Sequence, residues 1–440
     1  MRLERLLNRG GVAFIVIAIS SIGLSKSAGY YGTLLRGFDA QFYYAAARSA
    51  AVSGDWDVTD DLPLSPWQAP FQTEYGTPLR PDGGIKNVFP VGLSLVEAGL
   101  LVPARLFSHA FGIADEPAGY TPFEIGWVAF GLLVITAIGL QVMYTFARTL
   151  TAPSSATLIV LASWAGSPLF YQTAWFPFTS QPTTLTVMVL LLAVADRIPR
   201  SENPNRFVIA FGSLAAFLFL LRPQESPFII ILTIWRVLEV CRKGLRTWLP
   251  GTVIGLSICL AAVVFQASVH RLNLGHFRLV GHGQHDHPMI SGRFDLTAPH
   301  FDIVLFSSSQ GMLWTTPLAL VAFAGYAFRP REIPWWGWAT LINALMSLTI
   351  IAFWSDPWLG ESFGIRIWSE HIPVLVCGLA VLMGQPGAVP VARRRLVGFA
   401  ICTCVAWTTL LALMYVQGRL QRNMTHSQVI TQAAALFGGH

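Results

Sequence analysis

A single carboxylate, Asp39, stands between an apolar run and an aromatic stretch in GFDAQFYYAAARSAAVSGDWD, residues 37–57. A carboxylate at the edge of an apolar segment is expensive to place there, which makes it a candidate functional group. Asp39 could accept a proton from an attacking nucleophile as a general base. It also precedes a predicted interfacial helix, AQFYYAAARSAA, and could cap that helix. The two roles are compatible, because a cap also fixes the position of the carboxylate.

Further polar groups follow Asp39 along the same segment. Tyr43, Tyr44 and Arg48 come at helical spacing, and their aromatic rings suit the headgroup zone of a membrane. We expect the later acidic side chains to lie in a solvated loop. These are Asp55, Asp57, Asp60 and Asp61.

A second candidate group lies in SDPWLGESFGIR, residues 355–366, which ends at Arg366 where another apolar run begins. An arginine there can bind a phosphate through two parallel hydrogen bonds. It can equally be an interface arginine that reaches into the headgroups. Asp356 and Glu361 could pair with Arg366 or serve as second carboxylates.

Two polar clusters interrupt apolar runs. LFSSSQGMLWTTPLAL, residues 305–320, contains three serines and Gln310, groups that line a cavity or bind neighbouring helices at such a depth. LLRPQESP, residues 220–227, places Arg222 at a proline-broken turn, where the backbone needs a lining of protein or water.

Histidines gather between residues 270 and 302. His282, His285 and His287, together with Asp286, resemble a metal-binding tract in composition. Because no helical HxxxH pattern occurs, we expect a solvated, titratable loop and no specific metal site. The histidines are His270, His276, His282, His285, His287 and His300.

The elements that carry these groups follow from composition. Of the 440 residues, 53% are hydrophobic and only 12% are charged, against roughly 25% charged in a soluble domain. The mean hydropathy is +0.54. These values predict an all-α polytopic membrane protein. The five cysteines form no CxxC pair, so neither a disulfide framework nor a zinc site is indicated. The net charge of +6 reflects membrane topology, and no nucleic-acid partner is expected.

Twelve apolar runs are candidates for membrane spans, and the basic loops between them test the orientation. The run at 88–107 carries Glu97 and is interrupted by Pro103, which suits an interfacial helix better than a span. If that run does not cross, every basic loop falls on the side of the N-terminus. The other eleven runs are 11–25, 122–147, 155–175, 180–196, 207–221, 225–241, 247–269, 303–327, 335–354, 367–384 and 396–416.

We therefore expect about eleven transmembrane helices in one integral domain, residues 1–440, with the N-terminus cytoplasmic. This topology makes residues 26–121 the first extracytoplasmic loop, with juxtamembrane helices in it. It also places the histidine-rich loop, residues 270–302, and the segments 355–366 and 417–440 on the extracytoplasmic side. Asp39 then lies at the outer membrane–water boundary.

Several motifs resemble the GT-C class of membrane glycosyltransferases, which use polyprenyl-phosphate sugars. The class includes the protein O-mannosyltransferases and the lipid A aminoarabinose transferases. Asp39 with FYYAAA is similar to the catalytic aspartate in the first outer loop of the class. NVFPVGLSLVEAGLL, residues 87–101, looks like its juxtamembrane helix. SPLFYQTAWFPFTSQP, LLRPQ, SSSQGMLWTTPL and GESFGIRIWSEHIPVLVCGLA resemble further class motifs in order and position.

The resemblance implies roles for the candidate residues. Asp39 would be the catalytic base in an inverting transfer. Four cations would bind the phosphate of the donor, namely Arg366, Arg222, Lys86 and Arg293. Five side chains would contact the sugar or the acceptor, namely Tyr43, Tyr44, Glu361, Gln310 and Trp358. Some members of the class use a divalent cation, and this sequence leaves the cofactor open.

The chain departs from the class pattern in its acidic residues. The neighbours of Asp39 are Phe38 and Ala40, where many members carry a second acid. The second outer loop, AWFPFTSQP, also lacks the aspartate of the aminoarabinose transferases. A two-carboxylate site would therefore need Glu361 or Glu74.

The function we expect is transfer of a sugar from a polyprenyl phosphate to an envelope acceptor at the outer face of the plasma (cell inner) membrane. The alternative is a transporter or flippase of a lipid-linked or small solute. Transporters commonly show two related halves and charges at the midplane of the bilayer. Here the charges gather on one face and no repeat is visible, which favours the enzyme. A non-catalytic assembly protein is a third possibility.

Overall fold

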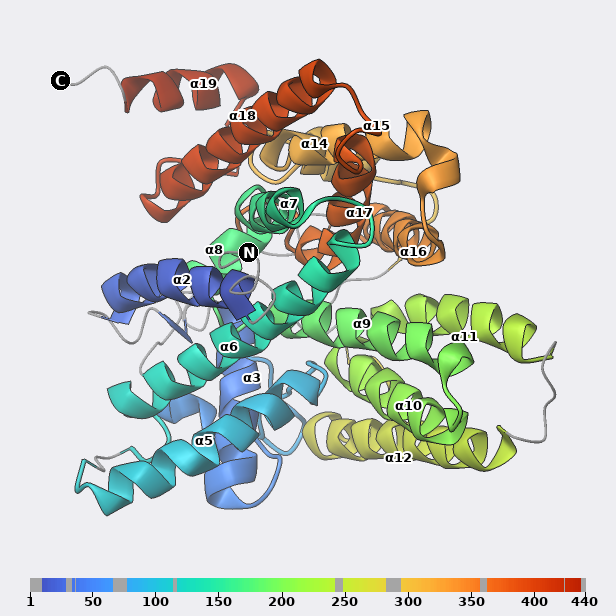
Figure 1. Cartoon of the computed structure of the whole chain (residues 1–440). Coiled ribbons are helices and arrows are strands. Elements are labelled where there is room, and N and C mark those ends of the chain that lie inside the picture. The colour runs from blue at the N-terminus through green and yellow to red at the C-terminus, as the bar shows by residue number, and fades with distance from the viewer. Residues whose placement is uncertain are drawn as a thin grey trace. The chain divides into compact units, whose positions relative to one another are not determined.

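The computed structural model describes residues 10–28, 34–35, 37–65, 77–113, 117–241, 248–281, 294–356, 362–422 and 424–436. Over these residues the chain is built from helices, and its only paired extended backbone consists of isolated bridges such as that between Leu79 and Ile85. Figure 1 shows the helices in chain order. The prediction of an all-α membrane protein is confirmed.

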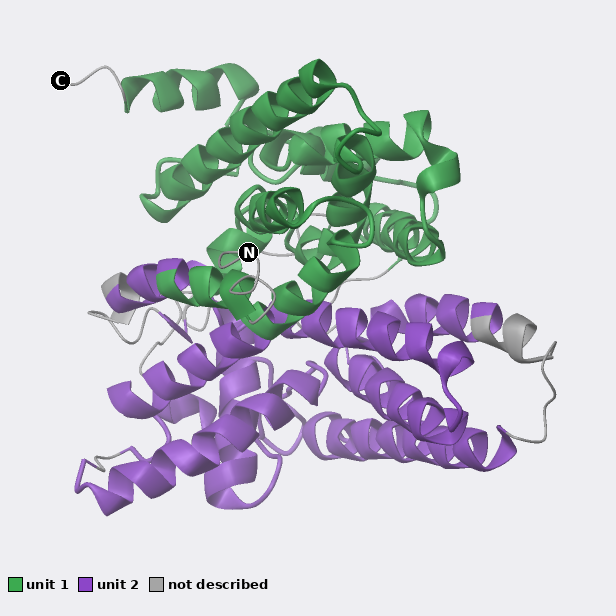
Figure 2. Cartoon of the chain, viewed as in Figure 1, with its two compact units in different colours: residues 1–18, 137–173, 294–440 green, residues 19–136, 174–293 purple. Residues whose placement is uncertain are grey.

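The helices fall into two compact units (Figure 2). Unit 1 comprises residues 1–18, 137–173 and 294–440, and unit 2 comprises residues 19–136 and 174–293. Two helices, α2 (Val12–Ala28) and α6 (Pro122–Ala147), continue from one unit into the other. Unit 2 further contains α3 (Phe38–Arg48), α5 (Gly92–Ala110), α9 (Ser180–Arg197), α10 (Pro204–Leu221), α11 (Ser226–Cys241) and α12 (Leu249–Leu274). Unit 1 contains α7 (Pro153–Ala165), most of α8 (Pro168–Ala174), α13 (Phe301–Phe306), α14 (Met312–Thr315), α15 (Leu318–Phe328), α16 (Trp335–Ala352), α17 (Ile372–Met383), α18 (Val391–Val416) and α19 (His426–Ala435).

Seven helical segments of the described chain are long and apolar enough to cross a membrane, and three shorter apolar helices accompany them. Side chains such as Leu256 on α12 and Phe399 on α18 are 65% and 72% exposed, as expected for surfaces that face lipid. The seven segments are Pro122–Ala147, Ser180–Arg200, Pro204–Leu221, Leu249–Leu274, Trp335–Ala352, Arg366–Met383 and Val391–Val416. The three shorter ones are Val12–Ser25, Pro153–Ala165 and Leu318–Phe328.

The run at 88–107 forms α5, which is not among the seven candidate spans. Glu97 lies in its middle and lowers its hydropathy. The predicted interruption at Pro103 is wrong, because α5 continues through this residue. A proline removes one backbone donor from a helix without always ending it.

Two runs that we predicted as single spans are broken in the structure. The run at 303–327 is divided into α13, α14 and α15, because Gly311 and Pro317 interrupt it. A Cβ atom on Gly311 would lie 2.3 Å from the backbone nitrogen of Ser307, so the chain turns tightly there. The run at 155–175 is divided at Gly166 into α7 and α8.

Close backbone contacts hold the helices of each unit together. In unit 2, a Cβ atom on Gly212 of α10 would lie 2.5 Å from the Cα atom of Gly255 on α12. In unit 1, a Cβ atom on Gly325 of α15 would lie 2.2 Å from the carbonyl oxygen of Gly378 on α17. Small residues allow helices in a membrane to approach this closely.

Candidate functional site in unit 2

Asp39 lies in the first turn of α3 and is half-buried. The predicted capping role is wrong, because the N-cap of α3 is Gly37, whose φ of 104° favours glycine. A Cβ atom on Gly37 would lie 2.8 Å from the ring of Phe176. Asp39 therefore sits beside the Phe176 segment, and the helix dipole stabilises its negative charge.

The predicted sugar-binding tyrosines of α3 face the interior of unit 2. The ring of Tyr43 packs against Phe89, with the ring centroids 5.1 Å apart. The hydroxyl of Tyr44 donates to the carbonyl oxygen of Gly119 at 2.7 Å, and its ring is fully buried. Both rings therefore serve the packing of α3.

Lys86 precedes α5 on a segment that packs along α3. The ring of Phe89, three residues later, makes an edge-on contact with Phe38, the neighbour of Asp39. Lys86 itself is 6% exposed. At the end of this segment, a Cβ atom on Gly92 would lie 2.4 Å from the backbone nitrogen of Leu221. The segment thus connects the first turn of α3 with the end of α10.

Arg222 follows α10 directly and is also buried. Its guanidinium donates to the hydroxyl of Ser180, the first residue of α9, at 3.2 Å. With the side-chain amide of Gln224 in its favoured orientation, the amide oxygen accepts two more hydrogen bonds from Arg222, at 2.6 and 3.0 Å. Ser180 lies four residues after Phe176, which contacts Gly37.

These contacts link the elements that carry Asp39, Lys86 and Arg222, and we call the linked elements one neighbourhood of unit 2. The neighbourhood is formed by the start of α3, residues 86–92, residues 176–181 and the turn between α10 and α11. It combines a half-buried carboxylate with two buried cations. A carboxylate can accept a proton, and buried cations can stabilise a leaving phosphate.

A buried ion pair holds the far end of α3. Arg48 bonds to the carboxylate of Asp61, which is 1% exposed, and donates from Nε to the carbonyl oxygen of Ala118 at 2.6 Å. The prediction that Asp61 lies in a solvated loop is wrong for this residue. Neighbouring Asp57 pairs with Arg80 at 2.8 Å. Although partial burial opposes it, hydrogen bonds from Thr59 and Arg80 lower the pKa of Asp57.

Glu97 is a fully buried acid beneath α3. Neither of its carboxyl oxygens has a hydrogen-bond partner within the described chain. Burial raises the pKa of Glu97 well above its ordinary value. A buried carboxyl without a partner is held in its neutral form.

The remaining described candidates belong to unit 1. Arg366 is half-buried at the start of a 3-10 helix, η10 (Arg366–His371), and its carbonyl oxygen accepts from Gln172 at 3.5 Å. Gln310 donates to the carbonyl oxygen of Ser362 at 3.2 Å. Within η10, Glu370 and His371 are buried and offer ligand atoms within 4.8 Å of each other. These two side chains could contribute to binding a divalent cation.

Some predicted residues lie outside the described residues, and one lies in a different element. His270 belongs to α12 and bonds to Gln266 at 2.8 Å, so the predicted loop begins later than residue 270. The predicted residues outside the described ranges are Arg293, Glu361, Trp358, Glu74, His282, His285 and His287.

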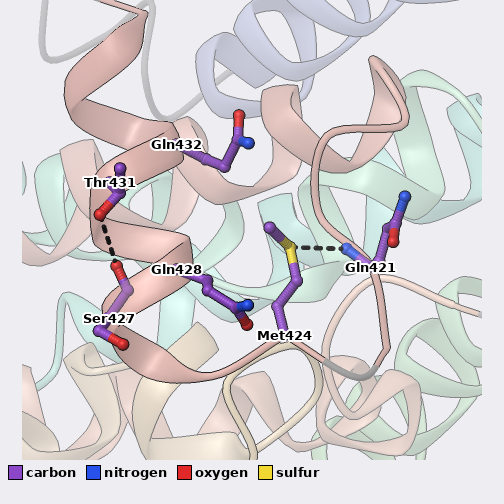
Figure 3. Close-up of a pocket in the computed structure, with 6 residues that line it drawn as sticks. All are labelled: Gln421, Met424, Ser427, Gln428, Thr431 and Gln432. Carbon is purple, nitrogen blue, oxygen red and sulfur yellow. Dashed lines mark hydrogen bonds between the residues drawn. The ribbon is translucent and has the colours of Figure 1, made fainter.

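A surface hollow of about 410 Å³ lies in unit 1, around the C-terminal segment (Figure 3). It contains no titratable side chain, so it cannot supply a base or a phosphate-binding cation. Its lining consists of Gln421, Met424, Ser427, Gln428, Thr431 and Gln432.

Ser180 and its neighbours in TSQP were not predicted as site residues, because they are neutral residues at the start of an apolar run. The pairing of Arg48 with Asp61 was also not predicted, since thirteen positions separate them. The sequence did carry a signal for TSQP, namely the unusual density of polar residues in this segment. Such density indicates packing or binding only when the partners are known.

No protein-family model matches the chain, and no curated protein sequence matches it. Among solved structures, the chain is similar to ArnT from Cupriavidus metallidurans bound to undecaprenyl phosphate. The identity is 15% and the TM-score is 0.46, over 97% of this chain and 75% of that one. The apo structure of the same protein gives 13% identity and a TM-score of 0.43, with the same coverage. ArnT belongs to the GT-C class that the sequence motifs resemble. The functional proposal is carried by the chain's own residues.

Proposed function

We propose that this chain is a membrane glycosyltransferase that moves a sugar from a polyprenyl phosphate to an acceptor at the extracytoplasmic face. The observation that supports the proposal is that contacts link the elements of unit 2 that carry half-buried Asp39 and buried Lys86 and Arg222. The sequence motifs give the substrate class by resemblance. The sugar is a hexose or a pentose, and the acceptor is a lipid, glycan or protein of the envelope.

The reaction is a single displacement that uses both the carboxylate and the two cations. Asp39 accepts the proton of the attacking hydroxyl or amine as the new bond forms at the anomeric carbon. The bond between that carbon and the phosphate oxygen breaks, and polyprenyl phosphate is the leaving group. Lys86 and Arg222 stabilise the charge that develops on the leaving phosphate. Attack from the face opposite the phosphate inverts the anomeric configuration.

The sequence motifs name further candidates, which belong to unit 1 or lie outside the described ranges. Arg366 and Arg293 are further candidates for the phosphate. Gln310, Glu361 and Trp358 are candidates for the sugar or the acceptor. The distribution of basic loops supports a cytoplasmic N-terminus and an active site on the outer face of the plasma membrane.

The test is a transfer assay with the purified protein in liposomes. Polyprenyl phosphates that carry labelled hexoses or pentoses are supplied with an envelope lipid extract as acceptor. The proposal predicts label in the acceptor and release of unglycosylated polyprenyl phosphate. Movement of the intact donor across the bilayer without release of polyprenyl phosphate would instead support a flippase.

A further inference from the structure

Two polar side-chain atoms at the start of α9 have no hydrogen-bond partner within the described chain. Thr179 is the N-cap of α9, but its hydroxyl does not cap the helix. The hydroxyl of Thr179 and the amide oxygen of Gln181 are both buried without a partner, and each residue is 2% exposed. Buried polar atoms in native proteins are almost always bonded, so each of these atoms needs an explanation.

The chemistry of these atoms restricts what could satisfy them. An amide oxygen accepts hydrogen bonds and donates none. An ionised phosphate has no proton to donate, so it cannot satisfy the oxygen of Gln181. A hydroxyl can both donate and accept, and it matches the side chains of Gln181 and Thr179 alike. The pair therefore fits a ligand rich in hydroxyl groups.

Thr179 and Gln181 lie on the segment that contacts both the proposed phosphate-binding cation, Arg222, and the residue that precedes α3, Gly37. Ser180, between Thr179 and Gln181, accepts a hydrogen bond from Arg222 at 3.2 Å. Phe176, three residues before Thr179, lies against Gly37 in front of α3. Thr179 and Gln181 thus flank the residue that binds Arg222, on the same segment as the ring that meets Gly37.

We propose that Thr179 and Gln181 bind hydroxyl groups of the donor sugar and so help to select it. This inference rests on the proposed function. The phosphate of the donor lies toward Arg222, and its sugar lies along the first turn of α9. The first backbone N–H groups of a helix also lack partners within the helix, and they add donors at the same place.

The experiment uses the near-isosteric variants Thr179→Val and Gln181→Leu of the full chain in liposomes. Each is expected to reduce kcat/KM for the complete donor about tenfold, the effect of one lost hydrogen bond in a buried site. Each is also expected to raise or preserve Tm, because an unsatisfied buried polar atom has been removed. The matched control is Thr184→Val, because the hydroxyl of Thr184 already donates to the carbonyl oxygen of Ser180 at 2.8 Å. The control should lower Tm and leave sugar preference unchanged.

Donors that lack single hydroxyl groups identify the contact. Wild-type protein should discriminate against one deoxy-sugar donor, and Gln181→Leu should lose that discrimination. If both variants transfer the complete donor like wild type, with the same preference among deoxy sugars, the inference is overturned. If wild-type protein transfers no sugar at all, the proposed function fails instead, and the inference fails with it.

Discussion

Arg222 donates a hydrogen bond to the hydroxyl of Ser180 at 3.2 Å, which joins the end of α10 to the first residue of α9. Both side chains are buried in unit 2. This bond fixes a guanidinium beside the segment that packs against the start of α3. It therefore connects a phosphate-binding group with the element that carries the proposed base.

Replacement of Arg222 by Gln should weaken donor binding. The variant loses a charged donor from a buried site, and hydrogen bonds to charged groups contribute about 1.5–3 kcal/mol each. We expect kcat/KM for the polyprenyl-phosphate sugar to fall by about 10- to 100-fold. The loss of transfer rate should be larger when this substrate is present at low concentration. Transfer kinetics over a range of donor concentrations check this. The control Arg200→Gln removes an exposed arginine and should leave the kinetics unchanged.

Gly37→Ala should displace the carboxylate of Asp39 while leaving that side chain chemically unchanged. The backbone of Gly37 is in the left-handed region, and a Cβ atom would lie 2.8 Å from the ring of Phe176. We expect at least a tenfold loss of transfer activity, since a displacement near 1 Å at a reacting group has effects of that size or more. Gly83→Ala is the matched control, because its φ is +88° but a Cβ atom there would meet nothing within 4 Å. Equal losses in both variants would contradict the argument.

The Arg48–Asp61 pair should stabilise the fold of unit 2. Asp61→Asn leaves a buried guanidinium without its counter-charge, which destabilises proteins by about 3–5 kcal/mol. Thermal unfolding in detergent should show a clearly lower Tm for this variant. Asp82→Asn provides the comparison, because Asp82 pairs with Arg80 at the surface and should shift Tm little. A Tm for Asp61→Asn equal to that of wild type would show that the pair does not hold α3.

Glu97→Gln should change how stability depends on pH. Burial raises the pKa of Glu97 in the folded state, so the unfolded chain releases this proton first as the pH rises. The free energy of unfolding of wild type should then fall with pH by up to about 1.4 kcal/mol per unit, starting near the ordinary glutamate pKa. The variant lacks this contribution.

The measurement for Glu97 is the difference in Tm between variant and wild type from pH 5 to pH 8. The difference should widen in favour of Gln as the pH rises. Glu202→Gln, at an exposed position, should show no such trend. A difference that is constant over this range would mean that Glu97 is ionised in the fold.

Hydropathy alone predicted the helical membrane architecture, because each long apolar run must satisfy its backbone within a helix. Glu97 and the distribution of the basic loops then separated α5 from the candidate spans. Hydropathy did not predict the breaks at Gly311 and Pro317, because the run as a whole is apolar even though serines and Gln310 precede Gly311. Local turn chemistry decides those breaks.

The candidate site was predictable only in part. Asp39 and Arg222 were visible as charges at the ends of apolar runs. The first-turn position of Asp39 depends on Gly37 and its contact with Phe176, more than 130 positions away. The burial of Tyr44 and the missing partners of Gln181 likewise depend on tertiary packing. A sequence shows which groups are polar, whereas their partners come from the fold.

The role of Asp39 as the base is tested most directly by the rate of sugar transfer by Asp39→Asn relative to wild type. Asn keeps the size of the side chain and removes its ability to accept a proton. We expect the transfer rate to fall by about 10²- to 10⁴-fold, the usual contribution of a general base, with an unchanged Tm. Asp60→Asn, an exposed aspartate of the same loop, should transfer sugar like wild type. Transfer by Asp39→Asn within twofold of wild type would contradict the assignment of Asp39 as the base.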